Sequence, residues 1–443
     1  MVSRPALGLC ALLAWAPLPL ASNRPWSLAL LLAGFFVLAA WVAARLPETR
    51  PAWTSAQRLA LAGAVWTVVW ALAQATPGLG GGLAHWADLA ALTGRPPWGS
   101  LSIDPMATVD GALRLTGYAT AAWLGAALFG GDPRHRLLLV RTLAVVGAGL
   151  AVYALVVLAS GTQTIGWLEK WTYHDVATAT FVNRNAYAVY AGVAVAAALV
   201  AAREAAAARA RWIWRGCAVL GMAAMILTES RWGLASVLTG LVALALIRPP
   251  GHAVPWRGLV AGGVAVIGLV PILLWMTGRG RWLERLEPAY LLGDLRWDLY
   301  RVTVTAIQEV PWTGHGLGTF PVLYHRLRDE TLTGHLVLQA HSVPLELATE
   351  LGVPAALALM SAVVALAVGA FGQARTSGDP LARLAVAAAV MAGLHGLLDF
   401  SMHMPAAAVT VMVLLGAGSA ARGTPAVLIV AGRPLIVDVR PLP

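Results

Sequence analysis

The chain has 443 residues, of which 59% are hydrophobic and only 12% are charged. Soluble domains carry about 25% charged residues, so the composition excludes an ordinary soluble protein and favours an integral membrane protein. The formal net charge is +10, and it is carried almost entirely by arginine because Lys170 is the only lysine. Many of these arginines lie in short loops between apolar runs, and no basic amphipathic segment with interleaved aromatic residues occurs. This pattern excludes nucleic-acid binding.

Apolar runs follow one another along most of the chain, and a run of about 20 residues is enough to cross a bilayer as a helix. Because such spans consume chain quickly, we predict one all-α polytopic membrane domain over residues 1–443 instead of several soluble domains. About twelve transmembrane helices are predicted. They cover residues 5–21, 26–45, 58–76, 112–130, 137–159, 181–202, 212–228, 232–248, 258–277, 344–371, 383–398 and 405–421.

The arginines between these spans indicate a topology. With the amino terminus inside, the arginine-bearing loops that follow the even-numbered spans all fall in the cytoplasm, as the positive-inside rule requires. The same count places the loops at 77–111, 160–180 and 278–343 outside, and the proline-broken tail at 422–443 in the cytoplasm. The first span could instead be a cleaved signal peptide, but its two internal prolines and the lack of a small-x-small cleavage site favour a retained span.

The longest polar stretch, residues 278–343, interrupts the apolar runs and must lie in water beside the membrane. Its arginines carry planar guanidinium groups that suit phosphate recognition, although each one alone can equally be a solvated charge. They are Arg279, Arg281, Arg285, Arg296, Arg301, Arg326 and Arg328. The run GHGLGTF at 314–320 has no alternation of strand and helix around it, so we interpret it as a tight turn and not as a nucleotide-binding loop.

Two further arginines lie at the outer edge of predicted spans. Arg184 opens a span between Asn183 and Asn185, and Arg231 lies in a very short outer turn. Strong hydrogen-bonding groups are costly at such positions. Each arginine can be an interfacial anchor that snorkels to headgroups, or a group that holds an anion while the neighbouring amides orient it.

Histidines form two patterns near the outer face. His341 lies where the long loop re-enters the membrane, and an imidazole at a water-accessible edge can accept a proton near neutral pH. Further on, His395, Asp399 and His403 recur at every fourth residue, which would place them on one face of a continued helix. Such a set can bind a metal, but a structural polar cluster at a helix end is the preferred interpretation.

Together these motifs resemble the O-antigen ligase and O-antigen polymerase (Wzy-type) superfamily of bacterial envelope glycosyltransferases. The landmarks are FVNRNAYA at 181–188, ESRWG at 229–233, RWDLYRVTVTAIQEVPWTGHGLGTF at 296–320, and His341 with Ser342, separated by nine residues from Gly352. The closing HGLLDFSMHMPA at 395–406 is similar to a pattern found in many members. The resemblance covers residues 57–420 and implies a GT-C-like fold, with a large, partly helical periplasmic loop between the spans.

The resemblance also implies an activity. It indicates a metal-independent, inverting glycosyltransferase without a cofactor, in the bacterial inner membrane, with its active face in the periplasm. The donor would be an undecaprenyl-diphosphate-linked glycan, and the acceptor a lipid A-core of lipopolysaccharide, another glycan or a protein. The implied roles are a catalytic base at His341, diphosphate binding by Arg184, Arg231, Arg296 and Arg301, and support from Asn183, Asn185, Ser342, Gly352 and Asp399.

Other functions stay open on the sequence. A polymerase that joins repeat units and a protein O-oligosaccharyltransferase would share the same motifs. A transporter for a solute or a lipid-linked sugar is the alternative from another class, and a structural scaffold is a third. Two features count against the transporter, because no inverted pair of broken spans is evident and the polar residues gather at one membrane face instead of the midplane.

Overall fold

The computed structural model describes residues 2–45, 53–80, 84–94, 99–254, 296–328 and 337–421, with isolated positions between 256 and 272 and at 332. It also describes the backbone of residues 426–430 and 433–437. The predicted span at 258–277 lies largely outside the described residues, and Arg279, Arg281 and Arg285 lie wholly outside them.

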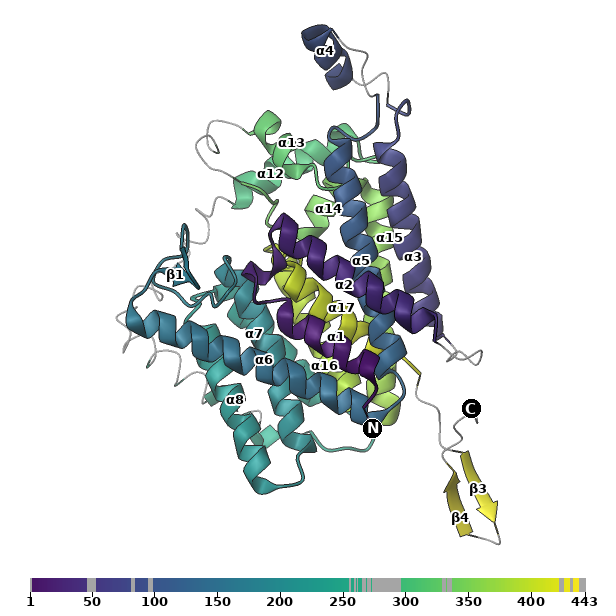
Figure 1. Cartoon of the computed structure of the whole chain (residues 1–443), viewed down its shortest axis with the longest axis vertical. Coiled ribbons are helices and arrows are strands. Elements are labelled where there is room, and N and C mark those ends of the chain that lie inside the picture. The colour runs from purple at the N-terminus through teal and green to yellow at the C-terminus, as the bar shows by residue number, and fades with distance from the viewer. Residues whose placement is uncertain are drawn as a thin grey trace.

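Helices make up most of the described chain (Figure 1). Those long and apolar enough to cross a membrane are α2 (Pro25–Ala43), α3 (Ser55–Ala75), α6 (Pro133–Ser160), α7 (Arg184–Glu204) and α15 (Val353–Ser377). Shorter apolar helices are α1 (Arg4–Trp15), α9 (Arg231–Leu246), α16 (Pro380–Gly396) and α17 (Pro405–Ser419). Two more predicted spans overlap α5 (Pro105–Phe129) and α8 (Ala208–Ile226). A polytopic helical membrane protein is thus confirmed.

Helix α7 lies at the centre of one half of the bundle. It packs against α6, α8, α9 and α16, and 94% of its apolar window is buried inside the protein, against 17% for α3. Its many alanines allow this, because small side chains let neighbouring helices approach closely in a membrane. The consequence is that the polar residues at the amino end of α7 face other helices and not lipid.

A second close contact joins α5 to α17 in the other half. A methyl group on Gly125 would lie 2.3 Å from the carbonyl oxygen of Val413, and one on Gly416 would lie only 1.8 Å from that of Ala122. Only glycine at both positions permits this approach of the two backbones. Helices α3 and α15 pack beside this pair.

Two predicted spans differ from the structure. The span at 344–371 was wrong as a single helix, because the chain forms α14 (Val343–Leu351) and then α15, with Gly352 between them at φ 78° and ψ 157°. A side chain at Gly352 would lie 2.5 Å from the carbonyl oxygen of Trp312, so the break is fixed by packing against the long loop. The predicted span at 5–21 is shortened to α1, because Pro17 and Pro19 follow its last residue.

The connecting segments add short elements. They are η1 (Leu20–Ser22), α4 (Ala84–Thr93), the hairpin of β1 (Thr164–Ile165) with β2 (Leu168–Glu169), and η4 (Ser401–His403). In the tail, β3 (Ala426–Val430) pairs antiparallel with β4 (Arg433–Val437). The polar segment predicted at 278–343 contains α12 (Arg296–Glu309) and α13 (Phe320–Leu327), which lie beside α14 at one end of the bundle (Figure 1).

The GHGLGTF run forms a turn, as predicted. Gly314, Gly316 and Gly318 all have positive φ, which glycine adopts without strain. The amide of Gly316 donates to the carbonyl oxygen of Glu350 at 2.9 Å, and a methyl group on Gly314 would lie 2.3 Å from that same oxygen. The turn therefore docks the polar segment directly onto the end of α14.

Candidate functional site

The amino end of α7 supplies the first polar groups of the site. Asn183 caps the helix, because its side-chain oxygen accepts hydrogen bonds from the backbone amides of Asn185 at 2.7 Å and Ala186 at 3.0 Å. Such capping satisfies donors that have no partner within the helix. With Asn183 used as the cap, Asn185 is the amide that reaches another element.

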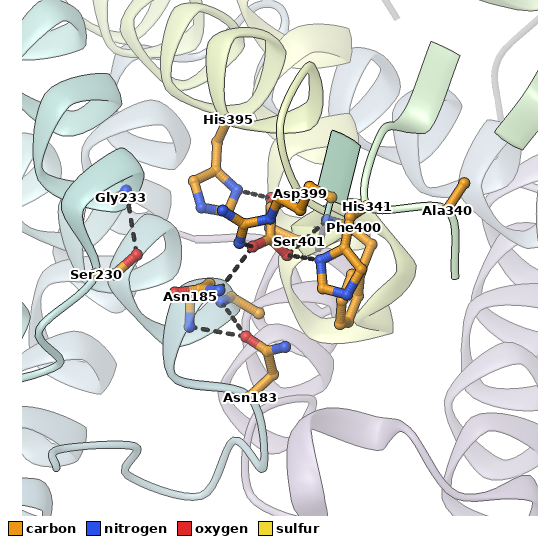
Figure 2. A network of polar contacts seen from close by, with 12 residues as sticks. Asn183, Asn185, Ser230, Gly233, Ala340, His341, His395, Asp399, Phe400 and Ser401 are labelled. Carbon is orange, nitrogen blue, oxygen red and sulfur yellow. Dashed lines mark hydrogen bonds and ion pairs between the residues drawn. The ribbon is translucent and has the colours of Figure 1, made fainter. Parts of the chain in front are cut away.

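The carboxylate of Asp399 is the centre of the site (Figure 2). It follows the end of α16 and is 1% exposed. Its Oδ2 accepts from Asn185 Nδ2 at 2.6 Å and from Arg296 Nη2 at 3.0 Å, and its Oδ1 accepts from the backbone amide of Phe400 at 2.8 Å. Segments that are far apart in the chain, namely α7, α12 and the α16–α17 loop, therefore meet at one buried charge.

Electrostatics keep this carboxylate ionised. Burial alone would raise the pKa of Asp399, but the side chains of His341, His395 and Arg296 outweigh burial and lower the pKa to about 2. A permanent negative charge can stabilise a neighbouring imidazole in its protonated form.

His341 lies directly beside this charge. Its Nδ1 is 3.9 Å from Asp399 Oδ1, which is too long for a hydrogen bond but close enough for electrostatic attraction. Its ring meets the edge of Phe400 at 4.7 Å between centroids, and its side chain remains 25% exposed. The imidazole is therefore held in place while one part stays accessible to a substrate.

The backbone of His341 is strained. Its φ is 54°, a value that costs a non-glycine residue energy and persists where the surroundings enforce it. The hydroxyl of Tyr300 donates to its carbonyl oxygen at 2.8 Å. The backbone amide of Ala340, just before it, donates to Glu346 Oε2 at 2.7 Å. Both contacts hold the left-handed turn that presents the imidazole.

Arg184 lies near the turn that precedes Arg231. Arg184 Nη1 is 4.0 Å from Glu229 Oε2, and Glu229 lies in the α8–α9 turn two residues before Arg231. The guanidinium of Arg184 also stacks over the ring of Tyr173 at 5.4 Å. The pKa of Tyr173 is raised by burial and by the charge of Asp399, while Arg184 and Arg296 oppose this. Tyr173 thus lies within electrostatic range of Arg184, Arg296 and the central carboxylate.

Two further buried carboxylates, Glu346 and Glu350, were missed by the sequence analysis. Glu346 Oε1 is 2.8 Å from Nε2 of His403, and Glu350 Oε1 accepts from the backbone amide of Phe320 at 3.1 Å. The signal that could have identified the pair was two carboxylates inside a predicted span, which is costly without a role. Glu346 joins the His341 turn to the α16–α17 loop, which also carries Asp399.

The metal-binding alternative for His395, Asp399 and His403 assumed that the three side chains lie on one face of a continued helix. Helix α16 ends at Gly396, so the four-residue spacing does not place the three side chains on one face. Among the described residues His395 contacts Ser401 at 3.0 Å, Asp399 pairs with Arg296, and His403 pairs with Glu346. No group of three potential metal ligands occurs in the described part of the chain. The preferred interpretation as a structural polar cluster agrees with these contacts.

Some predicted site residues lie away from the central carboxylate. Arg301 is 61% exposed and pairs with Asp298 one turn earlier on α12. Ser342 is buried at the start of α14 without a side-chain capping bond, and Gly352 provides the α14–α15 break. Arg326 pairs with Glu309 on the exposed side of α12. Of the loop arginines that the structure describes, Arg296 is the one that reaches Asp399.

A cavity of about 1150 Å³ begins on the other side of the His341 turn. Its walls are mainly apolar and come from α3, α5, α15, α16 and α17, with Asp110 and Arg114 of α5 among the lining residues, while Glu346, Glu350 and His403 line one end. Along α5 the lining runs from Ala107 to Gly130, a rise of about 35 Å. The hydrocarbon core of a bilayer is about 30 Å thick, so the lining along α5 is comparable in length to that thickness.

Fold and site together define a polytopic membrane protein with a histidine, carboxylate and arginine centre at one end of its helices and an apolar cavity beside it. Residues 216–360 match the family model described as O-antigen ligase, so this segment is an O-antigen ligase family domain. The resemblance seen in the motifs is confirmed over these residues. The domain contains Arg231, Arg296 and His341 and implies a glycosyltransferase that acts on lipid-linked glycans in the bacterial inner membrane. A search of curated proteins found no match.

Proposed function

We propose that this protein transfers a glycan from an undecaprenyl-diphosphate-linked donor to an acceptor hydroxyl at the periplasmic face of the inner membrane. The observation that supports this best is the meeting of Asn185, Arg296 and His341 around the carboxylate of Asp399. The donor is already activated by its diphosphate, so no nucleotide site is required.

His341 is the catalytic base in this proposal. The acceptor hydroxyl attacks the anomeric carbon of the donor, the bond from that carbon to the diphosphate oxygen breaks, and the hydroxyl proton passes to the imidazole. Asp399 then stabilises the imidazolium. Proton transfer to a positioned base contributes about 10² to 10⁴ in rate. Direct displacement inverts the configuration of the anomeric carbon.

The arginines stabilise the leaving group. Negative charge grows on the diphosphate as the bond breaks, so cationic groups aimed at that charge lower the barrier, and loss of one costs about 3 kcal/mol. Arg184 and Arg231 lie at adjoining helix starts, and Arg296 lies at the start of α12. A guanidinium has five N–H donors, so Arg296 can bridge Asp399 and a phosphate oxygen. Arg301, which is exposed, is assigned to a more peripheral part of the diphosphate site.

The cavity supports a lipid-linked substrate. Its apolar walls suit a polyprenyl chain, and its polar end lies at Glu346 and His403, next to the turn that carries His341. A chain lying in the cavity would therefore bring its head to the proposed reaction centre. The arginine-bearing loops predicted at the opposite membrane face support a periplasmic orientation.

The test is glycan transfer in vitro from purified lipid-linked donor. His341→Ala should abolish transfer while the variant remains folded in the membrane. The matched control is His325→Ala, because His325 is exposed on α13 in the same polar segment. Wild-type activity of His341→Ala would refute the base assignment and would favour a transporter or a scaffold.

Acceptor identity is tested in the same assay. Lipid A-core, a second lipid-linked repeat unit and a secreted protein are offered separately, which distinguishes a ligase from a polymerase and from a protein O-oligosaccharyltransferase. Each reaction is run with and without a divalent cation. Activity that depends on the cation would contradict the metal-independent mechanism.

A further inference from the structure

A second group of arginines lies at the end of the bundle opposite the candidate site. Helices α7, α9 and α16 each have one end at that site. Their other ends carry Arg203, Arg248 and Arg383. On α16, Arg383 is twelve residues from His395, which corresponds to a rise of about 18 Å along the helix.

Packing brings these three helix ends together. Helix α16 lies against both α7 and α9. The guanidinium of Arg383 donates to the carbonyl oxygen of Leu244 in the last turn of α9, and Arg248 Nε donates to that of Ala245 at 2.9 Å. Pro249 lies close to the α15–α16 turn, where a methyl group on Gly378 would be 2.9 Å from its ring. Two guanidinium groups are thus fixed at one helix end.

Positive charge in this cluster exceeds negative charge. Arg203 and Arg248 both lie within electrostatic range of Arg383, and the carboxylate of Glu204 opposes their effect on it. The nearby Asp379 is paired with Arg136 of α6. Like charges held together repel one another, and a bound anion would relieve that repulsion.

The cluster also contains hydrogen-bond donors without partners. Arg383 is only 9% exposed. Its Nε, and Nη2 of Arg248, are buried and have no hydrogen-bond acceptor within the described part of the chain. Buried polar atoms in folded proteins nearly always have a partner, so an orphaned pair of guanidinium donors points to a missing acceptor. A compact anion would meet donors from both helices and would also balance their charge.

We propose that Arg203, Arg248 and Arg383 bind the headgroup phosphate of an anionic phospholipid such as phosphatidylglycerol. The phosphate bridges the ends of α7, α9 and α16. Val242 and Leu246 are exposed on the last turns of α9 that lead to Arg248, so they can contact the acyl chains of the same lipid. Basic pockets between helices at the cytoplasmic face recognise anionic headgroups in this way.

The test measures lipid binding to the full-length protein. Native mass spectrometry of the purified protein in detergent is combined with titration of dioleoyl phosphatidylglycerol or dioleoyl phosphatidylcholine. Phosphatidylglycerol should bind preferentially. Arg203→Gln and Arg248→Gln should each weaken its binding about fivefold. Arg203 is exposed and lies at the very end of α7, so its substitution leaves the packing of α16 intact.

A substitution that should strengthen lipid binding gives the sharpest test. Glu204→Gln removes the opposing carboxylate and should strengthen binding of phosphatidylglycerol. The control is Arg375→Gln, because Arg375 is exposed at the end of α15 and should leave binding unchanged.

Three results would overturn the proposal. They are equal binding of the two lipids, equal weakening by Arg375→Gln and Arg203→Gln, or weaker binding after Glu204→Gln. Inorganic phosphate is titrated in parallel. If inorganic phosphate displaces the lipid at a comparable concentration, the site binds free phosphate and the proposal of a phospholipid headgroup is rejected.

Discussion

A single buried carboxylate organises the side chains of the candidate site. Asp399 accepts hydrogen bonds from an amide, a guanidinium and a backbone N–H, and an imidazole lies beside it. In a buried cluster the removal of one charge leaves its partner uncompensated, and breaking such a pair typically costs about 3–5 kcal/mol. Activity and stability should therefore both depend on this residue.

Asp399→Asn separates the two effects. The variant keeps the shape of the side chain but removes the charge that stabilises Arg296 and a protonated His341, so we expect at least about 100-fold lower transfer and a lower melting temperature. Adding Arg296→Gln should recover part of the thermal stability, because both partners of the pair are then neutral, but it should not recover transfer.

The control for this pair lies on the same polar segment. Asp298→Asn removes an exposed carboxylate whose described partner is Arg301, and it should change neither quantity. Transfer assays and thermal unfolding in detergent provide the two readouts. Full activity of Asp399→Asn would show that the charge has no part in the reaction.

At the scale of elements, the α14–α15 break determines where the long loop meets the bundle. Gly352 has a φ of 78° and lies against the backbone of Trp312. Gly352→Ala should strain this backbone by about 1–3 kcal/mol and add a clash, so we expect a clearly lower melting temperature. Gly372→Ala on α15 is the control, because no atom lies within 4 Å of its added methyl group. Equal melting temperatures of the two variants would contradict this account.

Helix α14 should also make stability depend on pH. Burial and the neighbouring Glu346 raise the pKa of Glu350 to about 8 from an ordinary value of 4.5. The folded state therefore holds a proton that the unfolded state releases, and the resulting stability should be lost as pH rises through that window. The nearby His403 has its pKa lowered by burial but raised more by Glu346, so its contribution is lost in the same direction.

Glu350→Gln tests this dependence. Glutamine keeps an acceptor for the backbone amide of Phe320 but cannot ionise. The melting temperature should therefore fall less between about pH 5 and pH 8.5, the range over which Glu350 would lose its proton. Glu169→Gln on the exposed strand β2 is the control. An unchanged pH profile in Glu350→Gln would remove Glu350 as its source.

Much of the fold could be predicted from the sequence, because hydropathy identifies helices that must hide their backbone from lipid. The motif residues Asn185, Arg296 and His341 could be named, but their common partner was assigned only a supporting role. Residues Glu346 and Glu350 were missed because VPLELATEL was interpreted as part of one span. The break at Gly352 depends on packing against Trp312, and local sequence does not reveal such a contact. The predicted end of the neighbouring span at 398 lies two residues beyond the end of α16 at Gly396.

For the whole molecule, the cavity is the feature that relates the site to the membrane. If a polyprenyl chain lies in it, as proposed, a bulky side chain in its wall should weaken donor use. Ala367→Trp on α15 projects into the lining, and we expect a raised KM for the lipid-linked donor with a smaller change in kcat. Ala29→Trp on the exposed side of α2 is the control. Unchanged KM in Ala367→Trp would place the donor chain elsewhere.

The pairing of Asn185 with Asp399 also has a consequence for biosynthesis. The two residues are 214 positions apart in the chain, and ribosomes add about 5–20 residues per second. On that scale about 10–40 s pass between synthesis of the first partner and synthesis of the second. During this interval the amino end of α7 must reside in the translocation machinery or the bilayer without its later carboxylate. If the proposed function holds, the nascent protein therefore lacks transfer activity until α16 has been inserted and the following loop has emerged.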